Sequence, residues 1–184
     1  MDAVLHSFLL VAFAEMGDKT QLLAFILATR FRKPWAIFSG IFVATILNHL
    51  LASTAGNWVA HTIPRDDLKW VLASIFIAFA GWILLPDKEE GSKENGRFGA
   101  FITTLVTFFL AEMGDKTQLS TVALAAKYQN VFLVTTGTTL GMLFSDGLAI
   151  VFGEKLVEKV PMKRVRMVAS ALFVLFGIAI LIGY

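Results

Sequence analysis

Long runs of apolar residues alternate with short polar breaks along the whole chain. A helix that crosses a bilayer needs about 20 mostly apolar residues, and six segments meet this requirement. The pattern therefore predicts an all-α integral membrane protein with six transmembrane helices. The predicted helices cover residues 3–29, 34–61, 68–85, 98–126, 131–152 and 165–182.

One polar stretch separates these apolar runs into two groups of three. Residues 86–97 read PDKEEGSKENGR and combine a proline, two glycines and seven charged side chains, which is typical of a solvated linker. We therefore predict a single membrane domain made of two halves, residues 1–87 and 98–184, joined by a cytoplasmic linker at residues 88–97.

The composition supports a bilayer setting and excludes several kinds of site. Hydrophobic residues make up 57% of the chain and charged residues only 16%, whereas charged residues make up about 25% of an ordinary globular protein. The chain has no cysteine, which excludes disulfides, zinc–thiolate sites and thiol catalysis. The basic residues form short clusters between apolar runs rather than a stripe, so we expect no nucleic-acid partner.

Lysine and arginine residues are distributed unequally between the two ends of the predicted helices. Eleven lie in the connections that follow the first, third and fifth helices, and three lie in the opposite connections. Because cytoplasmic loops are enriched in Lys and Arg, we predict a multi-pass protein with both termini on the outer, periplasmic side. The eleven are Arg30, Arg32, Lys33, Lys88, Lys93, Arg97, Lys155, Lys159, Lys163, Arg164 and Arg166, and the three are Arg65, Lys69 and Lys127.

A nine-residue segment occurs twice in the chain. Residues 14–22 and residues 111–119 both read AEMGDKTQL, at an offset of 97 positions, and the same offset relates Gly40 to Gly137. Because each half has three predicted helices, the second half must enter the membrane from the opposite side. Inverted repeats are characteristic of secondary transporters, which bind substrate near the midplane between the repeats. Duplication is also a simple way to build a helix bundle, so that alternative stays open.

Each copy of the repeated segment places two carboxylates near the middle of a predicted helix. Glu15 and Asp18 are three residues apart, as are Glu112 and Asp115, so each pair lies on one helix face. An ionised aspartate at the centre of a membrane helix costs about 2.5–3.5 kcal/mol. We therefore expect all four side chains to face the protein interior and to meet there.

The net charge of this predicted cluster favours a divalent cation. The four carboxylates together with Lys19 and Lys116 have a formal charge of −2, and we interpret the lysines as ion-pair partners of the acids. Carboxylate and amide oxygens suit Ca²⁺, Mg²⁺ and Mn²⁺, and Gln21 and Gln118 lie three residues after the aspartates. The predicted metal ligands are Glu15, Asp18, Glu112, Asp115, Gln21 and Gln118.

Glycines and threonines within the repeated segment allow two interpretations each. Gly17 and Gly114 either break the helices, which frees carbonyl groups at an ion site, or serve close helix packing. Thr20 and Thr117 either add oxygens to the site or bond to the backbone of their own helix. The sequence alone leaves both questions open.

Three further polar residues lie in the second and fifth predicted helices. Asp146, His49 and Asn48 are candidates for a proton relay or pathway, because Asp146 is a fifth buried acid and an unperturbed histidine titrates near neutral pH. The alternative is that they form hydrogen bonds between helices.

The repeated Glu-x-Gly-Asp-Lys-Thr sequence closely resembles the E-x-G-D-[KR]-[ST] signature of the Gdt-type calcium/manganese cation transporters. Residues 15–20 and 112–117 match the signature at every position, and the resemblance covers the whole chain in length and layout. The small size is similar to that of the bacterial manganese exporters of this family. The resemblance implies export of Mn²⁺, with Ca²⁺ as a second candidate, in exchange for protons across the bacterial inner membrane. The metal ion is then a substrate, and no resident cofactor and no catalytic residues are expected.

Three other functions compete with that of a cation/proton antiporter. A channel or uniporter would use the same acidic cluster without proton coupling. An intramembrane aspartyl-type protease also uses paired membrane aspartates, but four symmetric acids with two lysines exceed what an aspartyl dyad needs. A membrane scaffold would have no use for buried acids. The expected partners are a divalent metal ion, protons and the lipid bilayer, and no oligomeric state is predicted.

Overall fold

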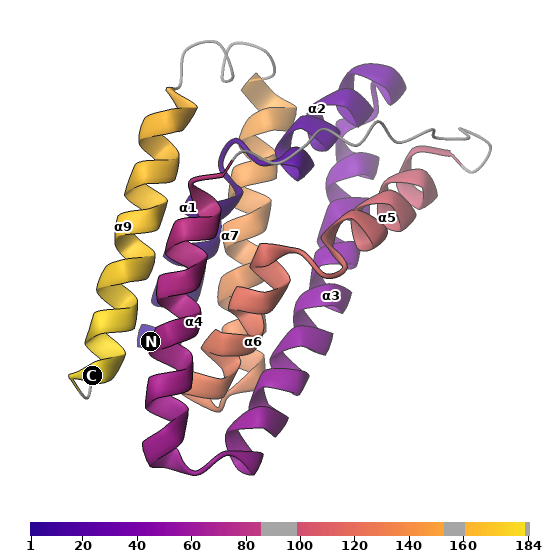
Figure 1. The fold of residues 1–184 in the computed structure, drawn as a ribbon. Coiled ribbons are helices and arrows are strands. Elements are labelled where there is room, and N and C mark those ends of the chain that lie inside the picture. Colours follow the sequence, from indigo (N-terminus) through magenta and orange to yellow (C-terminus); the bar gives the residue numbers. More distant parts are fainter. Residues whose placement is uncertain (86–98, 153–160, 183–184) are drawn as a thin grey trace.

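The computed structural model describes residues 1–85, 99–152 and 161–182, and within these ranges every regular element is an α-helix (Figure 1). The predicted all-α class is therefore confirmed, while the linker predicted at residues 88–97 lies outside the described residues. The helices are α1 (Asp2–Glu15), α2 (Lys19–Phe31), α3 (Pro34–Thr62), α4 (Arg65–Ile83), α5 (Gly99–Glu112), α6 (Lys116–Tyr128), α7 (Val131–Phe152) and α9 (Met162–Leu181).

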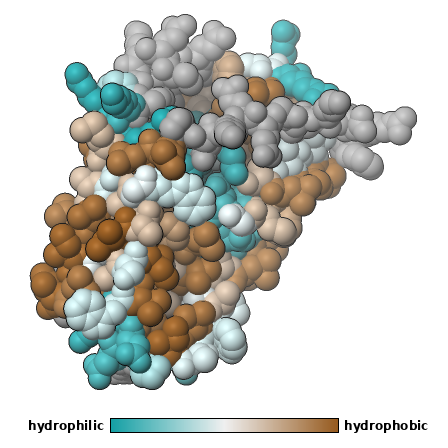
Figure 2. Space-filling model, in the orientation of Figure 1, coloured by the Kyte–Doolittle hydropathy of each residue, from teal (hydrophilic) through white to brown (hydrophobic). Residues whose placement is uncertain are grey.

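Three of the described helical segments are long and apolar enough to cross a membrane. They are Pro34–Thr62, Val131–Phe152 and Lys163–Leu181. Figure 2 shows apolar residues over much of one face of the molecule, with polar residues at its two ends and in a strip that extends from the upper end towards the middle. This distribution is the one expected of a protein whose middle lies in lipid and whose ends contact water.

The two copies of the repeated segment interrupt their helices. Residues 16–18 separate α1 from α2, and residues 113–115 separate α5 from α6 (Figure 1). Gly17 and Gly114 have φ angles of 82° and 80°, a left-handed conformation that glycine adopts without steric cost. Of the two interpretations of these glycines, the structure therefore shows the helix break.

The starts of α4 and α9 differ from the sequence prediction for a physical reason. Both helices begin three residues before the apolar runs, directly after Pro64 and Pro161. Proline favours helix starts because its φ angle is already helical and its missing N–H is not needed there. Asp66 and Asp67 occupy the first turn of α4, where negative charge is stabilised by the helix dipole. The first turns are therefore polar, and the apolar pattern underestimates the length of both helices.

The offset of 97 residues relates packing contacts as well as residue types. A Cβ atom on Gly40 of α3 would lie 2.8 Å from the Cβ of Thr104 in α5, and one on Gly137 of α7 would lie 2.8 Å from the Cβ of Ser7 in α1. Ser7 precedes Thr104 by the same 97 positions. Glycine thus permits a close helix approach at equivalent places in both halves.

Two hydrophobic cores lie apart from each other. The first joins the packed pair α4 and α9 to α1 and α6, and includes Phe76 and Phe173. The second joins α2 and α5 to α3 and α7, and includes Leu27 and Phe108. The pair α4–α9 therefore covers one half of each interrupted helix, namely α1 and α6.

Figure 1 also shows how the ends of the helices are grouped. Both chain termini lie at the end of the molecule that holds the α3–α4 and α6–α7 connections. The α2–α3 connection, the end of α4, the start of α5 and the end of α7 lie at the opposite end. The interrupted segments lie between these two ends.

Candidate functional site

The helix breaks bring acidic side chains from both halves of the chain together. Glu15, Glu112 and Asp115 each offer a carboxylate oxygen within 4.8 Å of the others. All three are buried, and so is Asp18, with no more than 8% of any of the four residues exposed. Carboxylates repel one another at such distances, so the cluster is an arrangement that a cation would stabilise.

Two ion pairs connect the copies of the repeated segment reciprocally. Lys19 Nζ lies 3.6 Å from Asp115 Oδ1, and Lys116 Nζ lies 3.4 Å from Asp18 Oδ1. Each lysine therefore pairs with the aspartate of the other copy rather than with its own neighbour. The two pairs differ in burial, because the side chain of Lys19 is 32% exposed and that of Lys116 only 6%.

The ends of the interrupted helices add partial charges to the site. Asp18 and Asp115 are the N-cap residues of α2 and α6, where the partial positive charge of a helix start stabilises a carboxylate. Asp115 Oδ1 also accepts a 2.8 Å hydrogen bond from the Lys116 backbone N–H. The last turns of α1 and α5 carry partial negative charge, and half-helix C-termini of this kind coordinate cations in transporters.

Two glutamines hold the helix breaks in place. The side-chain oxygen of Gln21 accepts a 2.8 Å hydrogen bond from the Gly17 N–H, and that of Gln118 accepts a 2.6 Å hydrogen bond from the Gly114 N–H. Gln21 Nε2 also donates to the carbonyl oxygen of Ser145 in α7, at 2.9 Å. The amide oxygens that we expected to face a metal ion are therefore already bonded to backbone N–H groups.

The hydroxyls of the two motif threonines both bind the same glutamate. Thr20 Oγ1 donates to Glu15 Oε2 at 2.7 Å, and Thr117 Oγ1 donates to Glu15 Oε1. Both carboxylate oxygens of Glu112 are buried and have no hydrogen-bond partner among the described residues. The two equivalent glutamates thus have different surroundings, which the sequence reasoning missed. The hydroxyl at the last position of the motif was the available signal.

The three residues considered for a proton pathway divide into two groups. Asn48 Nδ2 donates to the carbonyl oxygen of Phe109 in α5 at 3.0 Å, which is the hydrogen bond between helices that the alternative interpretation expects. His49 and Asp146 are buried, and their side-chain polar atoms have no hydrogen-bond partner within the described ranges. Asp146 also interacts electrostatically with both Glu15 and Glu112.

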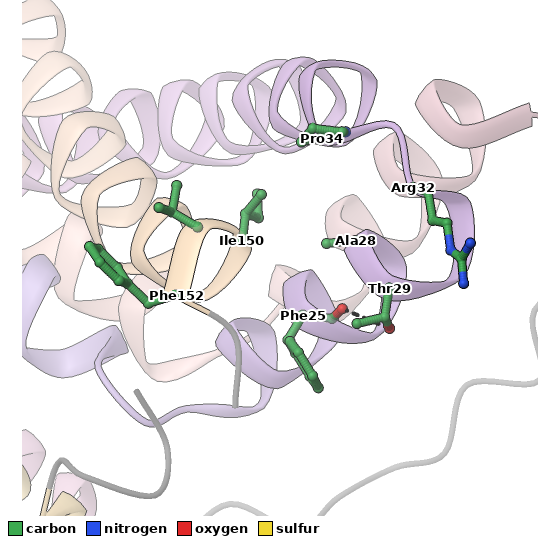
Figure 3. A pocket seen from close by; sticks show the side chains of 8 residues that line it. Phe25, Ala28, Thr29, Arg32, Pro34, Ile150 and Phe152 are labelled. Carbon is green, nitrogen blue, oxygen red and sulfur yellow. Dashed lines mark hydrogen bonds between the residues drawn. The ribbon is translucent and has the colours of Figure 1, made fainter. Parts of the chain in front are cut away.

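A cavity of about 340 Å³ lies at the far end of α2 from the helix break (Figure 3). Phe25, Ala28 and Thr29 of α2 line one side of it, and Ile150, Val151 and Phe152 at the end of α7 line another; Arg32 and Pro34 complete the lining.

The α6 residue that corresponds to Ala28 packs against α3. Ala28 corresponds to Ala125 of α6 at the offset of 97. There a Cβ atom on Gly56 of α3 would lie 2.9 Å from the Cβ of Ala125 and 2.1 Å from the carbonyl oxygen of Val122. The helices α3 and α6 therefore touch beside Ala125, whereas a cavity lies beside Ala28. Gly153, the counterpart of Gly56, lies outside the described residues.

Comparison with known proteins identifies the family of this chain. The family model described as "Divalent cation/proton antiporter GDT1" matches residues 3–91 and 100–184. The chain belongs to the GDT1 family. The resemblance predicted from the repeated motif is therefore confirmed, and this GDT1-family chain belongs to a family of transporters rather than of enzymes.

Curated relatives match over most of the GDT1-family chain. A protein of Vibrio cholerae serotype O1 named "Putative manganese exporter" is 44% identical over 180 residues, which cover 97% of this chain and 90% of the relative. A GDT1-like protein of Synechocystis is 27% identical over 92% of each chain. GDT1-like protein 3 of Arabidopsis thaliana is 26% identical over 97% of this chain and 70% of its own length. No solved structure gives a significant match.

Proposed function

We propose that this GDT1-family protein exports a divalent cation, Mn²⁺ first and Ca²⁺ second, from the cytoplasm in exchange for protons. The observation that carries the proposal is the buried cluster of Glu15, Glu112 and Asp115 at the junction of two interrupted helices. The match to the antiporter family supports proton exchange. The name of the Vibrio cholerae relative supports manganese as the ion.

In the proposed binding step, the cation takes the place of the two lysines. The four motif acids, Lys19 and Lys116 together have a charge of −2, and a divalent ion neutralises it. When the ion binds, each lysine releases its aspartate, so Asp18 and Asp115 join the two glutamates as ligands. Gln21 and Gln118 complete the proposed ligand set. A carbonyl oxygen has two lone pairs, so each amide can keep its glycine N–H and also face the ion.

We propose six membrane spans arranged as two inverted repeats, residues 1–87 and 98–184. The helices α1 and α2 have 14 and 13 residues, so their lengths add up to about 40 Å at 1.5 Å per residue, and those of α5 and α6 do the same. Near the centre of the molecule, Thr45 Oγ1 of α3 donates to Met142 Sδ of α7 at 3.3 Å, and these two residues are 97 positions apart. A contact between equivalent residues is expected on a pseudo-two-fold axis.

The proposed orientation places the cavity end of the molecule in the cytoplasm. Arg30, Arg32 and Lys33 lie at or near the α2–α3 connection, at the end opposite to both termini (Figure 1). Since basic residues mark the cytoplasmic side, the termini lie on the periplasmic side of the inner membrane. In this arrangement the cavity between α2 and α7 faces the cytoplasm, from which the exported ion would enter.

Protons are proposed to replace the cation at the carboxylates on the return step. A buried carboxylate without a hydrogen-bond or ionic partner needs either a cation or a proton. Asp146 and His49 fit a relay because both are buried and without hydrogen-bond partners in the described part of the chain. Asn48 is bonded to the α5 backbone and holds that helix beside the proposed pathway.

Transport by the purified protein in proteoliposomes tests this function. We expect Mn²⁺ flux that follows an imposed pH gradient and that is lost in the Asp115→Asn and Glu112→Gln variants. Asp66→Asn is the matched control, because Asp66 is an exposed acid at the start of α4. Mn²⁺ flux that ignores the gradient would favour a channel or uniporter.

Cells provide a second test of the direction of transport. Deleting the protein should raise cellular manganese and manganese sensitivity, and Asp115→Asn should fail to restore either. A change confined to another solute would contradict the assignment of the ion. Cleavage activity lost in Asp18→Asn with metal transport intact would instead favour the protease alternative.

A further inference from the structure

We propose that Thr20 and Thr117 are positioning residues that determine which motif glutamate binds the cation more strongly, and that both hydroxyls pass from one glutamate to the other during the cycle. The inference rests on the proposed transport function, because it concerns the same site. It assigns to the threonines a role distinct from metal ligation.

The first step is the competition between two glutamates for two hydroxyls. A hydroxyl group has a single proton to donate, and both motif threonines donate theirs to Glu15. Hydrogen bonds to a charged acceptor are stronger than those between neutral groups. Glu15 is thus satisfied as a carboxylate, while Glu112 has no donor among the described residues. In this state a bound cation stabilises the carboxylate of Glu112 more than that of Glu15.

The second step follows from the internal repeat. Thr117 follows Glu112 by five positions, just as Thr20 follows Glu15. The reverse arrangement, with both hydroxyls on Glu112, therefore needs only the movement of groups already present. Thr20 and Thr117 lie in the first turns of α2 and α6, so any shift of these helices moves the hydroxyls directly.

The helices α2 and α6, which carry the two hydroxyls, are packed differently against their neighbours. At present α6 touches α3 beside Gly56, whereas a cavity lies between α2 and the end of α7. If α2 closes on α7 while α6 moves away from α3, the halves exchange roles. The repeat then places both hydroxyls on Glu112 and makes Glu15 the stronger ligand of the cation.

The hydroxyls of Thr20 and Thr117 bind a carboxylate, whereas neighbouring hydroxyls on α6 bind the helix backbone. Ser120 and Thr121 donate to the carbonyl oxygen of Thr117, at 2.9 Å and 2.8 Å, which is the common use of a hydroxyl inside a helix. Thr121 is buried like Thr117 and lies one turn further along the same helix. Thr121→Val is therefore a matched control that removes a buried hydroxyl without touching Glu15.

The test compares Thr117→Val and Thr20→Val with Thr117→Ser, Thr20→Ser and Thr121→Val. Without one hydroxyl, an oxygen of Glu15 is left to be satisfied by the ion, so Mn²⁺ binds more tightly and leaves more slowly. We expect KM and the maximal rate of Mn²⁺ transport in proteoliposomes to fall together, each by about tenfold. The serine variants and Thr121→Val should retain wild-type values of both.

Equilibrium binding of Mn²⁺ to the purified protein, measured by calorimetry, provides a readout that does not need transport. The valine variants should bind Mn²⁺ about tenfold more tightly, and the serine variants should not. An increase in KM at unchanged maximal rate would show that the hydroxyls are direct ligands and would overturn the proposal. So would valine variants that behave like Thr121→Val.

Two controls keep the result interpretable. The same effect is expected of Thr20→Val in α2 and of Thr117→Val in α6. Either variant therefore tests the proposal if the other does not fold. A wild-type protein that shows no Mn²⁺ flux would refute the proposed function. Normal wild-type flux with unaffected valine variants would refute only the role of the threonines.

Discussion

At the scale of single residues, equivalent positions in the two motifs are not energetically equivalent. Lys116 and its partner Asp18 have side chains only 6% and 4% exposed, whereas Lys19 is 32% exposed beside Asp115. Removing one member of a buried ion pair costs about 3–5 kcal/mol because the other charge stays buried. A partly exposed pair contributes about 1 kcal/mol or less. Asp115 also retains its bond from the Lys116 backbone N–H.

This difference predicts unequal effects of the two lysine-to-methionine substitutions. Lys116→Met should lower the free energy of unfolding by about 3 kcal/mol. Lys19→Met should lower it by less, because Asp115 keeps the hydrogen bond from the Lys116 backbone N–H and Lys19 itself is partly exposed. Thermal and denaturant unfolding of the purified protein in detergent measures both. Equal losses of stability in the two variants would show that the greater exposure of Lys19 does not weaken its ion pair with Asp115.

The sequence could predict that acids from both copies of the repeated segment lie close together, but not which groups they bind. The cost of burying a carboxylate in a membrane led us to expect all four acids to meet. Carboxylate oxygens of Glu15, Glu112 and Asp115 lie within 4.8 Å of one another, whereas Asp18 is outside this group. Which oxygen binds which donor depends on distances of a few ångströms at the helix breaks. The motif threonines placed hydroxyl groups near the acids, but the sequence could not show that both bind Glu15 or that the Gly17 N–H binds Gln21.

At the scale of helices, the breaks depend on backbone conformation rather than on space. Gly114 has a φ angle of 80°, yet a Cβ atom placed on it would meet nothing within 4 Å. Gly81 inside α4 is also open to a Cβ atom but lies in ordinary helix. The two positions thus differ only in the conformation that an added methyl group must tolerate.

Alanine substitutions at Gly114 and Gly81 separate the effect of backbone conformation from that of the space for a Cβ atom. Gly114→Ala should destabilise the protein by about 1–2 kcal/mol, because L-residues are strained in the left-handed region. Gly81→Ala should stabilise it by about 0.5–1 kcal/mol, since alanine loses less backbone entropy in a helix. Thermal unfolding in detergent measures the two shifts, which should have opposite signs. A stabilised Gly114→Ala protein would mean that the break does not need the left-handed conformation.

Helix positions were predictable, whereas helix continuity was not. Apolar run length indicated helical segments in all the right regions, because burial in lipid or protein requires such runs. A glycine inside a helical pattern costs only about 1 kcal/mol, so the sequence could not decide between a continuous and an interrupted helix. The bonds from Gly17 and Gly114 to the following glutamines decide it, and they form only when the break exists.

At the scale of the whole molecule, a nearly symmetric sequence adopts an asymmetric packing. The repeat predicts that α2 relates to α7 as α6 relates to α3. The structure instead places α6 against α3 and leaves a cavity between α2 and the end of α7 (Figure 3). Identical motifs cannot specify which half carries the cavity. An asymmetry of this kind is what a transporter with alternating access requires.

Cysteine labelling tests both this asymmetry and the proposed orientation. The chain has no native cysteine, so Ala28→Cys and Ala125→Cys each introduce a single thiol at equivalent positions. Ala28 lines the cavity, whereas Ala125 is fully buried against α3. A membrane-impermeant maleimide should therefore label Ala28→Cys at least about tenfold faster than Ala125→Cys, because a thiol must reach water to react.

The labelling should occur in inverted vesicles and not in spheroplasts, since the cavity faces the cytoplasm in the proposed orientation. Faster labelling in spheroplasts would reverse the orientation, and equal rates at the two sites would contradict the asymmetry itself.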